Sequence, residues 1–116
     1  MQKNTEKRPW GSYCVIGQGE KFLIKEITVL PSSRLSLQYH NHRKEHWVIL
    51  EGEAVVTKAD RTITLKEGEH IDIEIKEIHC IENKTTSNLK VLEVQRGEIL
   101  KEEDIVRISD IYGRTK

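Results

Sequence analysis

The sequence predicts an all-β domain, because short apolar runs alternate with turn residues along most of its 116 residues. Residues 22–30 form an apolar, β-branched run that stops at Pro31, where two serines favour a turn. In residues 71–76, isoleucines alternate with charged side chains, which is the pattern of a half-buried strand. Many short strands with glycine-marked turns imply a closed or sandwiched β architecture.

The other elements follow from the same reasoning. Residues 46–50 form an apolar run that ends at Gly52, segments 53–57 and 62–65 predict a hairpin, and residues 89–94 predict the last strong strand. Beyond Gly97 the chain is charged with scattered isoleucines, which predicts a short helical turn or an irregular C-terminal arm. Residues 34–42 alternate, so one face of the expected strand carries Leu35, Leu37 and Tyr39, and the other carries Ser36, Gln38, His40 and His42.

Length and composition narrow the class of protein. Residues 1–116 are expected to form one domain, with no linker or repeat. Lysine plus arginine and aspartate plus glutamate each total 19, so no basic excess indicates a nucleic-acid partner. No apolar run has membrane-spanning length and residues 1–9 are polar, so we expect a cytoplasmic protein without a membrane partner. Cys14 and Cys80 are expected to be free thiols.

Four residues predict a metal centre: His40, His42, Glu45 and His79. Histidines at i and i+2 share one face of a strand, and a carboxylate and a third histidine complete the set. Three imidazoles and one carboxylate suit a divalent transition ion, so we expect one such ion per chain. Zinc is the first choice, with Mn, Fe, Co or Ni as alternatives. His46 is the competing ligand to Glu45, although an adjacent residue points to the other strand face.

The spacing around these ligands has a known counterpart. Gly52 follows Glu45 by a short run, Gly68 precedes His79, and Asn83 lies four residues after His79. The two segments, about residues 34–52 and 68–83, resemble the paired motifs of the cupin superfamily. That resemblance implies a double-stranded β-helix, or jelly-roll, barrel that holds one metal ion at its mouth.

Six segments narrow the resemblance further, and they are residues 8–13, 35–40, 43–47, 93–95, 103–107 and 110–114. In this order they resemble the C-terminal isomerase domain of type II mannose-6-phosphate isomerase/mannose-1-phosphate guanylyltransferase enzymes. The resemblance implies a metal-dependent sugar-phosphate isomerase that interconverts mannose 6-phosphate and fructose 6-phosphate in GDP-mannose or polysaccharide precursor biosynthesis. No guanylyltransferase activity is expected from this chain alone, because no glycine loop that cradles phosphate opens a helix.

Roles for individual residues follow from this resemblance and from strand alternation. An aldose–ketose isomerase needs a base, and Glu93 is the candidate because it shares a strand face with Gln95. His46 is an alternative acid or base. Gln38, on the face of His40, is either a substrate contact or an inward polar residue bonded to backbone. The expected substrate-binding residues are Gln38, Arg43, Gln95, Arg107 and Arg114, with Arg8 as a weaker candidate for the phosphate.

Other functions remain open at this point. The chain can be a non-catalytic cupin that binds a sugar phosphate or nucleotide sugar beside a separate guanylyltransferase. It can also be an Fe(II) cupin oxygenase, or an isomerase or epimerase of another sugar. A homodimer is expected, because the face of Leu35, Leu37 and Tyr39 needs a cover.

Overall fold

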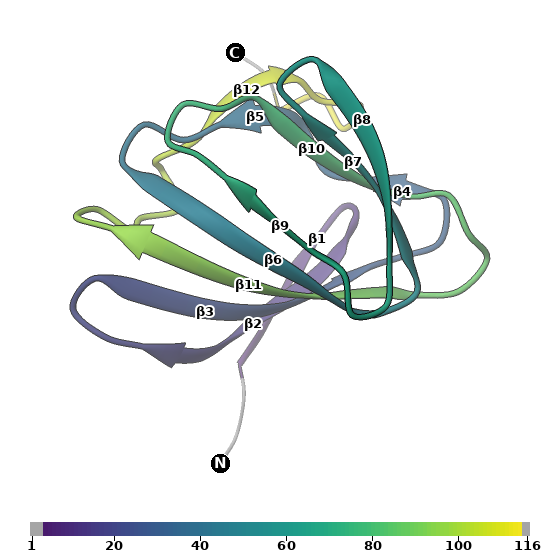
Figure 1. Cartoon of the computed structure of the whole chain (residues 1–116), viewed down its shortest axis with the longest axis horizontal. Helices are drawn as coiled ribbons and strands as arrows, with labels where there is room; N and C mark the ends of the chain where they lie inside the picture. The colour runs from purple at the N-terminus through teal and green to yellow at the C-terminus, as the bar shows by residue number, and fades with distance from the viewer. Residues whose placement is uncertain (1–3, 115–116) are drawn as a thin grey trace.

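The computed structural model describes residues 4–114, which form strands and turns but no helix. Figure 1 shows two sheets that face one another. The first sheet has the order β1 (Thr5–Arg8), β2 (Gly11–Gln18), β3 (Phe22–Val29), β11 (Leu89–Gly97), β6 (Arg43–Glu51) and β9 (His70–Ile73). The second has the order β12 (Val106–Ser109), β5 (Leu37–Tyr39), β10 (His79–Asn83), β7 (Glu53–Lys58) and β8 (Arg61–Lys66), with β4 (Ser33–Arg34) also paired to β10.

This arrangement confirms the predicted all-β, jelly-roll fold. The central strands of each sheet pair with partners that are distant in sequence, β11 with β3 and β6, and β10 with β5 and β7. The pairs are antiparallel, and the sheets stay separate along the part of the chain that the structure describes. In Figure 1 the sheets lie further apart at the end where β11 ends and β6 begins. Residues 4–114 contain no helix long and apolar enough to cross a membrane.

Alternate side chains of the strands build the apolar core between the sheets. Trp47 and Ile49 of β6, Val56 of β7, Ile81 of β10 and Val91 of β11 are all buried. Fully burying an aliphatic side chain of this size contributes about 1.5–3 kcal/mol. The core therefore holds in place the strands whose remaining inward positions carry polar groups.

One buried amide fixes the turn between β10 and β11. The Asn83 side chain is fully buried, and its Nδ2 donates to the carbonyl oxygens of Val29 at 2.9 Å and Ser87 at 2.8 Å. Its Oδ1 accepts from the backbone nitrogen of Thr85 at 3.0 Å and from that residue's hydroxyl at 2.8 Å. These bonds set the position of β10, the strand that begins at His79.

Two predictions about the chain path were wrong. Residues 34–42 do not form one strand, because β4 ends at Arg34, β5 covers only Leu37–Tyr39, and the backbone bends at residues 41–42 before β6 begins. As a result, Leu35 packs against the core instead of sharing an outer face with Leu37 and Tyr39.

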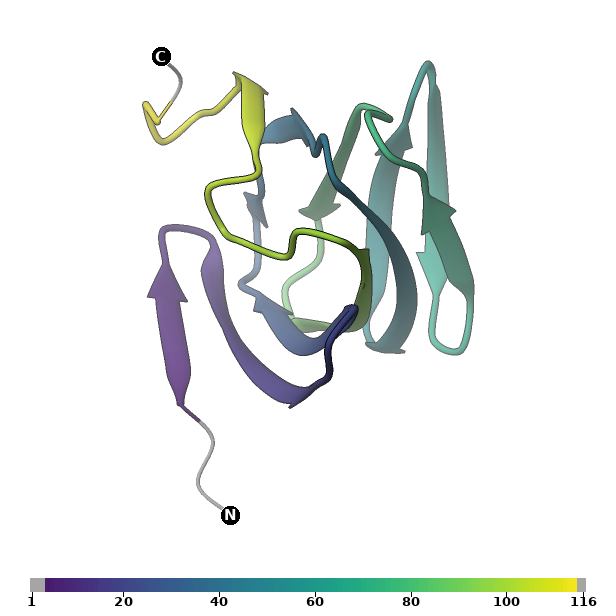
Figure 2. The ribbon, with the colours of Figure 1, turned by 90° about the vertical axis from the view of Figure 1, so that its left-hand side faces the viewer.

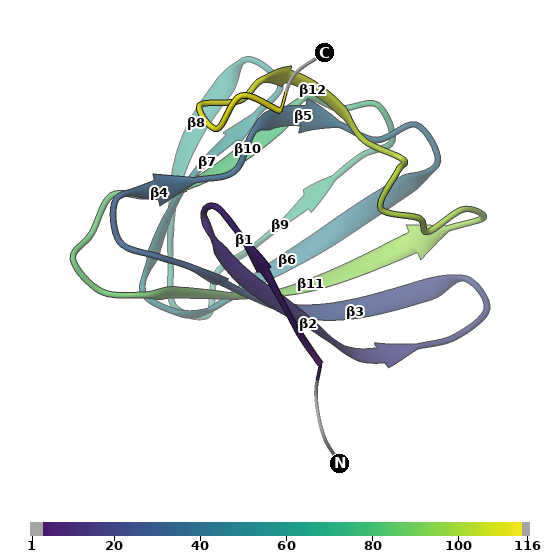
Figure 3. The ribbon, with the colours of Figure 1, turned by 180° about the vertical axis from the view of Figure 1, so that it is seen from behind.

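Of the two alternatives for the C-terminal part, the structure has the irregular arm, and residues 98–114 contain no helical turn. Figure 2 and Figure 3 show this segment, in yellow-green to yellow, running from the end of β11 across to the second sheet. There β12 pairs with β5. The arm thereby brings residues 101–107 beside the segment that carries His40.

Candidate metal centre

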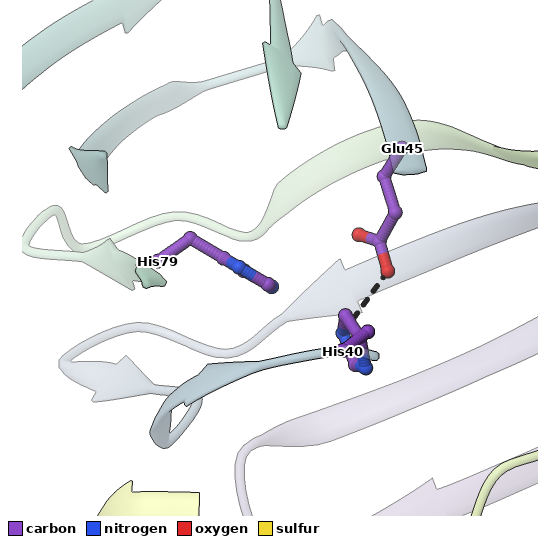
Figure 4. A group of neighbouring side chains, drawn as sticks. All are labelled: His40, Glu45 and His79. Atoms are coloured by element: carbon purple, nitrogen blue, oxygen red, sulfur yellow. Dashed lines mark ion pairs between the residues drawn. The ribbon is translucent and has the colours of Figure 1, made fainter. Parts of the chain in front are cut away.

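Three of the four predicted ligands meet between the sheets. His40 follows β5, Glu45 lies on β6 and His79 begins β10, and their exposed fractions are 3%, 3% and 1%. One ligand atom from each lies within 4.8 Å of the others. The Nε2 of His40 is 3.1 Å from Oε2 of Glu45, the contact drawn as a dashed line in Figure 4. Figure 4 also shows the three side chains directed toward a common space from three different segments of the chain.

Backbone carbonyls orient both imidazoles. Nδ1 of His40 donates to the carbonyl oxygen of Asp104 at 2.6 Å, and Nδ1 of His79 donates to that of Glu77 at 2.9 Å. A carbonyl oxygen only accepts, so Nδ1 of each ring carries a hydrogen, and Nε2 offers a lone pair to the interior whenever the ring is neutral. Burial lowers the pKa of His79, which favours its neutral, ligating form.

The third donor, Glu45, is held as a carboxylate. Burial pushes its pKa upward, but hydrogen bonds with His40 and Glu93 and the charge of Arg43 outweigh burial, so its pKa lies well below the usual range. Its Oε1 accepts a hydrogen bond from the Trp47 indole nitrogen at 2.8 Å. Two imidazole nitrogens and one carboxylate oxygen are ligands that zinc and related ions prefer, and three protein ligands leave a coordination position open. The donor chemistry therefore fits a divalent transition ion.

The structure places His42 outside this cluster, which contradicts its prediction as a ligand. Its side chain is exposed, and it is not part of the one metal-type cluster found among residues 4–114. The reason is the bend after β5: the Asp104 carboxylate accepts the backbone N–H of Asn41 at 2.9 Å and that of His42 at 3.0 Å. Strand alternation from His40 therefore fails, and Arg43 is the next residue that turns inward.

Arg43 is buried within the cluster. Its Nε donates to Oε2 of Glu45 at 2.9 Å, its Nη2 lies 3.3 Å from Nε2 of His40, and its Nη1 reaches the carbonyl oxygen of Lys101 at 3.4 Å. Burial works against the charge of Arg43, but the attraction of Glu45 and then Glu93 is stronger, so its pKa is raised. The guanidinium group of Arg43 thus contacts the candidate metal ligands Glu45 and His40, whereas the sequence predicted that Arg43 contacts the phosphate of the substrate.

Glu93 and Gln95 share the inner face of β11, as strand alternation predicts. Both are buried, and Nε2 of Gln95 donates to Oε2 of Glu93 at 2.9 Å. Burial, followed by the nearby charge of Glu45, raises the pKa of Glu93 to about 8. Glu93 lines a cavity beside the cluster, whereas Gln95 is fully buried and is not among the lining residues of that cavity.

His46 points away from this interior. It lies between the inward residues Glu45 and Trp47 on β6, so alternation turns it to the outer face of the sheet. There its Nδ1 contacts the carboxylate of Asp72, and its ring lies 5.1 Å from that of His70. The structure therefore contradicts His46 as a competing ligand and as the acid or base of an interior reaction.

The cavity beside the cluster is rich in basic groups. It is lined by His40, Gln38, Glu93, Glu102 and the basic residues Arg8, Lys25, Arg43, Arg107 and Arg114, together with Trp10, Tyr13, Ile27, Leu35 and Ile105. Nε of Arg107 is buried and has no hydrogen-bond partner within residues 4–114. Arg114 is instead paired with Asp110 through Nε at 2.7 Å and Nη2 at 3.0 Å.

The sequence left two roles open for Gln38, a substrate contact or an inward polar residue, and the structure gives it features of both. Its Oε1 accepts from the Ser36 hydroxyl at 2.7 Å, and its Nε2 lies 3.4 Å from Nε2 of His79. It also lines the cavity. The side chain of Gln38 thus contacts other side chains, and it helps to hold Nε2 of the candidate ligand His79 in place.

Sequence reasoning missed two residues. Lys25 is buried beside the cavity and its Nζ lies 2.5 Å from Oε2 of Glu102. Its alternation with Ile27 and Val29 on β3 could have revealed its inward position. Asp104, which orients His40 and the following loop, left no local signal because it lies 64 residues away.

The fold and the buried histidine–carboxylate cluster define this protein as a cupin with a candidate metal centre. Residues 1–110 match the family described as "Mannose-6-phosphate isomerase C-terminal", and the chain belongs to that family.

Comparison with known proteins agrees. The chain is 47% identical over 108 residues to the alginate biosynthesis protein AlgA of Pseudomonas aeruginosa, a match that covers 93% of this chain and 22% of that protein. It is 46% identical to the mannose-1-phosphate guanylyltransferase ManC of Salmonella typhimurium over 92% of this chain and 22% of that protein. The chain thus spans less than a quarter of these relatives. An RmlC-like cupin from Shewanella frigidimarina superposes with a TM-score of 0.76 over 88% of each chain at 13% identity, which supports the fold.

Proposed function

We propose that this chain is a metal-dependent isomerase domain that interconverts mannose 6-phosphate and fructose 6-phosphate. The observation that carries the proposal is one cavity, lined by His40 of the ligand-type cluster, that also contains a carboxyl group with a raised pKa and several basic side chains. The family description supports the reaction class. The relative named for alginate biosynthesis supports a place in the supply of mannose units for polysaccharide or GDP-mannose.

The reaction moves one proton between neighbouring carbons. From the aldose, Glu93 as carboxylate takes the proton of C2 and returns it to C1, while the hydroxyl proton of O2 is transferred to O1. A pKa near the working pH suits a group that must accept and release a proton in each turnover. A divalent ion held by His40, Glu45 and His79 would supply Lewis-acid polarisation of the sugar oxygens, worth several kcal/mol. Gln95 holds the Glu93 carboxyl in place through its amide.

Arg107 is the proposed anchor of the phosphate. A phosphate is bound best by a guanidinium group with unused donors, and Nε of Arg107 is a buried donor that has no partner among residues 4–114. Arg8 and Lys25 line the same cavity and add positive charge. Arg114 contributes charge, although its fork is shared with Asp110.

Steady-state kinetics on matched variants test these roles. Glu93→Gln should lower kcat by at least a hundredfold with little change in KM, because the amide cannot accept the proton. Glu102→Gln, which changes a carboxyl group of the same cavity, is the control and should retain most of kcat. Arg107→Met should chiefly raise KM for mannose 6-phosphate. Equal losses of kcat in the two glutamine variants would refute Glu93 as the base.

A non-catalytic sugar-phosphate binding cupin is the second candidate. Two observations favour it: Arg43 already engages two of the three ligand candidates, and one relative is named for guanylyl transfer alone. Calorimetric binding of mannose 6-phosphate without any turnover, in protein that has bound one equivalent of metal, would select this function over isomerisation.

A further inference from the structure

The close approach of His40 and Glu45 is the most unusual feature of the cluster. Oε2 of Glu45 and Nε2 of His40 lie 3.1 Å apart in the interior. A carboxylate oxygen offers a lone pair, and so does an imidazole nitrogen that carries no proton, so in that state a positive group is needed between or beside them. Arg43 supplies one, with Nε at 2.9 Å from the oxygen and Nη2 at 3.3 Å from the nitrogen.

Arg43 is built into this position. It lies two residues before Glu45 on β6, so strand alternation turns both side chains to the same inner face. Its third donor group reaches the carbonyl oxygen of Lys101 on the C-terminal arm. Only 6% of the residue is exposed, so its charge is held away from water beside the donors.

A metal ion and the Arg43 fork compete for the same lone pairs. A zinc ion bound to both donors would lie about 2.0–2.2 Å from each. Nε and Nη2 of Arg43 approach the same two atoms, at 2.9 Å from Oε2 of Glu45 and 3.3 Å from Nε2 of His40. Repulsion between a divalent ion and a guanidinium a few ångströms away is strong in a buried setting.

We infer that Arg43 is an internal competitor of the metal ion, which closes the cluster in the ion-free protein and must leave Glu45 and His40 before an ion can bind. The inference rests on the ion site of the proposed function. Arg43 keeps the buried carboxylate paired when no ion is present, and it weakens ion binding. The bound ion is therefore exchangeable, and ion occupancy follows the free concentration of the metal.

Calorimetric titration of chelator-stripped protein with Zn²⁺ tests this inference. Arg43→Met should bind Zn²⁺ at least tenfold more tightly than the wild type. The matched control is Arg107→Met, which removes the same charge from the same cavity without touching either donor, and its affinity should change less than threefold. Affinity of Arg43→Met equal to or weaker than that of the wild type would overturn the inference and leave the ion site intact.

Stability measurements cover the case in which Arg43→Met folds poorly without an ion. Arg43→Lys keeps the charge but lacks the fork, and its affinity should lie between those of the wild type and the methionine variant. Saturating Zn²⁺ should raise Tm more in Arg43→Met than in the wild type, whereas a merely structural role of Arg43 would give equal or smaller shifts and refute competition. Absence of Zn²⁺ binding by every form would instead refute the ion site, and with it both proposals.

Discussion

Replacing Glu93 by glutamine should change how the stability of the metal-free protein depends on pH. Burial and then the charge of Glu45 raise the pKa of Glu93 to about 8, against an ordinary value of 4.5. The folded protein therefore holds this proton more tightly than the unfolded chain does. The resulting stabilisation is fully present below pH 4.5 and is lost as the pH rises toward 8.

The size of the effect follows from the width of that window. Between pH 5 and pH 8 the wild type should lose up to about 4 kcal/mol of unfolding free energy as Glu93 loses its proton, because each pH unit corresponds to about 1.4 kcal/mol. Glutamine has the same shape, does not titrate, and can still accept the hydrogen bond from Gln95. The stability of Glu93→Gln relative to the wild type should therefore increase across this range.

Urea unfolding monitored by the fluorescence of the buried Trp10 and Trp47 measures this difference at each pH, with a chelator present. Glu102→Gln is the control. Burial pushes the pKa of Glu102 upward, but the charge of Lys25 outweighs burial and lowers the pKa. The pH range in which Glu102 changes the stability therefore lies below pH 4.5. Its stability relative to the wild type should stay constant from pH 5 to 8. An equally constant difference for Glu93→Gln would refute the buried, protonated state of Glu93.

Three further predictions concern the ligands, the core and the assembly. His79→Ala should lose at least 90% of bound metal by elemental analysis, whereas His42→Ala should keep it, and equal losses would restore His42 as a ligand. Asn83→Ala should lower the unfolding free energy by about 2–4 kcal/mol in urea, because four hydrogen bonds of a buried side chain are removed; a loss below ~0.5 kcal/mol would contradict their role. We also propose a homodimer that covers Leu37 and Tyr39, and light scattering at micromolar concentration should give twice the mass of the chain, whereas a monomer would refute it.

The sequence predicted the fold well because strand alternation is a local property. The buried positions of β6, β7 and β11 recur at every second residue, and the same alternation correctly placed Glu93 and Gln95 on one face. The hairpin of β1 and β2 and the short β12 lack such a pattern, since much of their surface is exposed or only partly buried. β1 and β2 pair with their neighbours in the chain, whereas the position of β12 depends on pairing with the distant β5, which periodicity does not report.

The candidate site could be predicted only in part. His40, Glu45 and His79 lie in segments whose spacing is characteristic, and the structure brings them together. The difference at His42 has one cause, because alternation was extended through a bend that Asp104 fixes from the C-terminal arm. A contact across that separation leaves no trace in local sequence.

The central claim is that ion, base and phosphate anchor act together in one cavity. The most direct test is proton NMR of fructose 6-phosphate in deuterated buffer with chelator-stripped protein, before and after one equivalent of Zn²⁺ or Mn²⁺. We predict that mannose 6-phosphate forms only after the ion is added and that His79→Ala forms none. Protein that has bound the ion stoichiometrically and still produces no mannose 6-phosphate would contradict the claim.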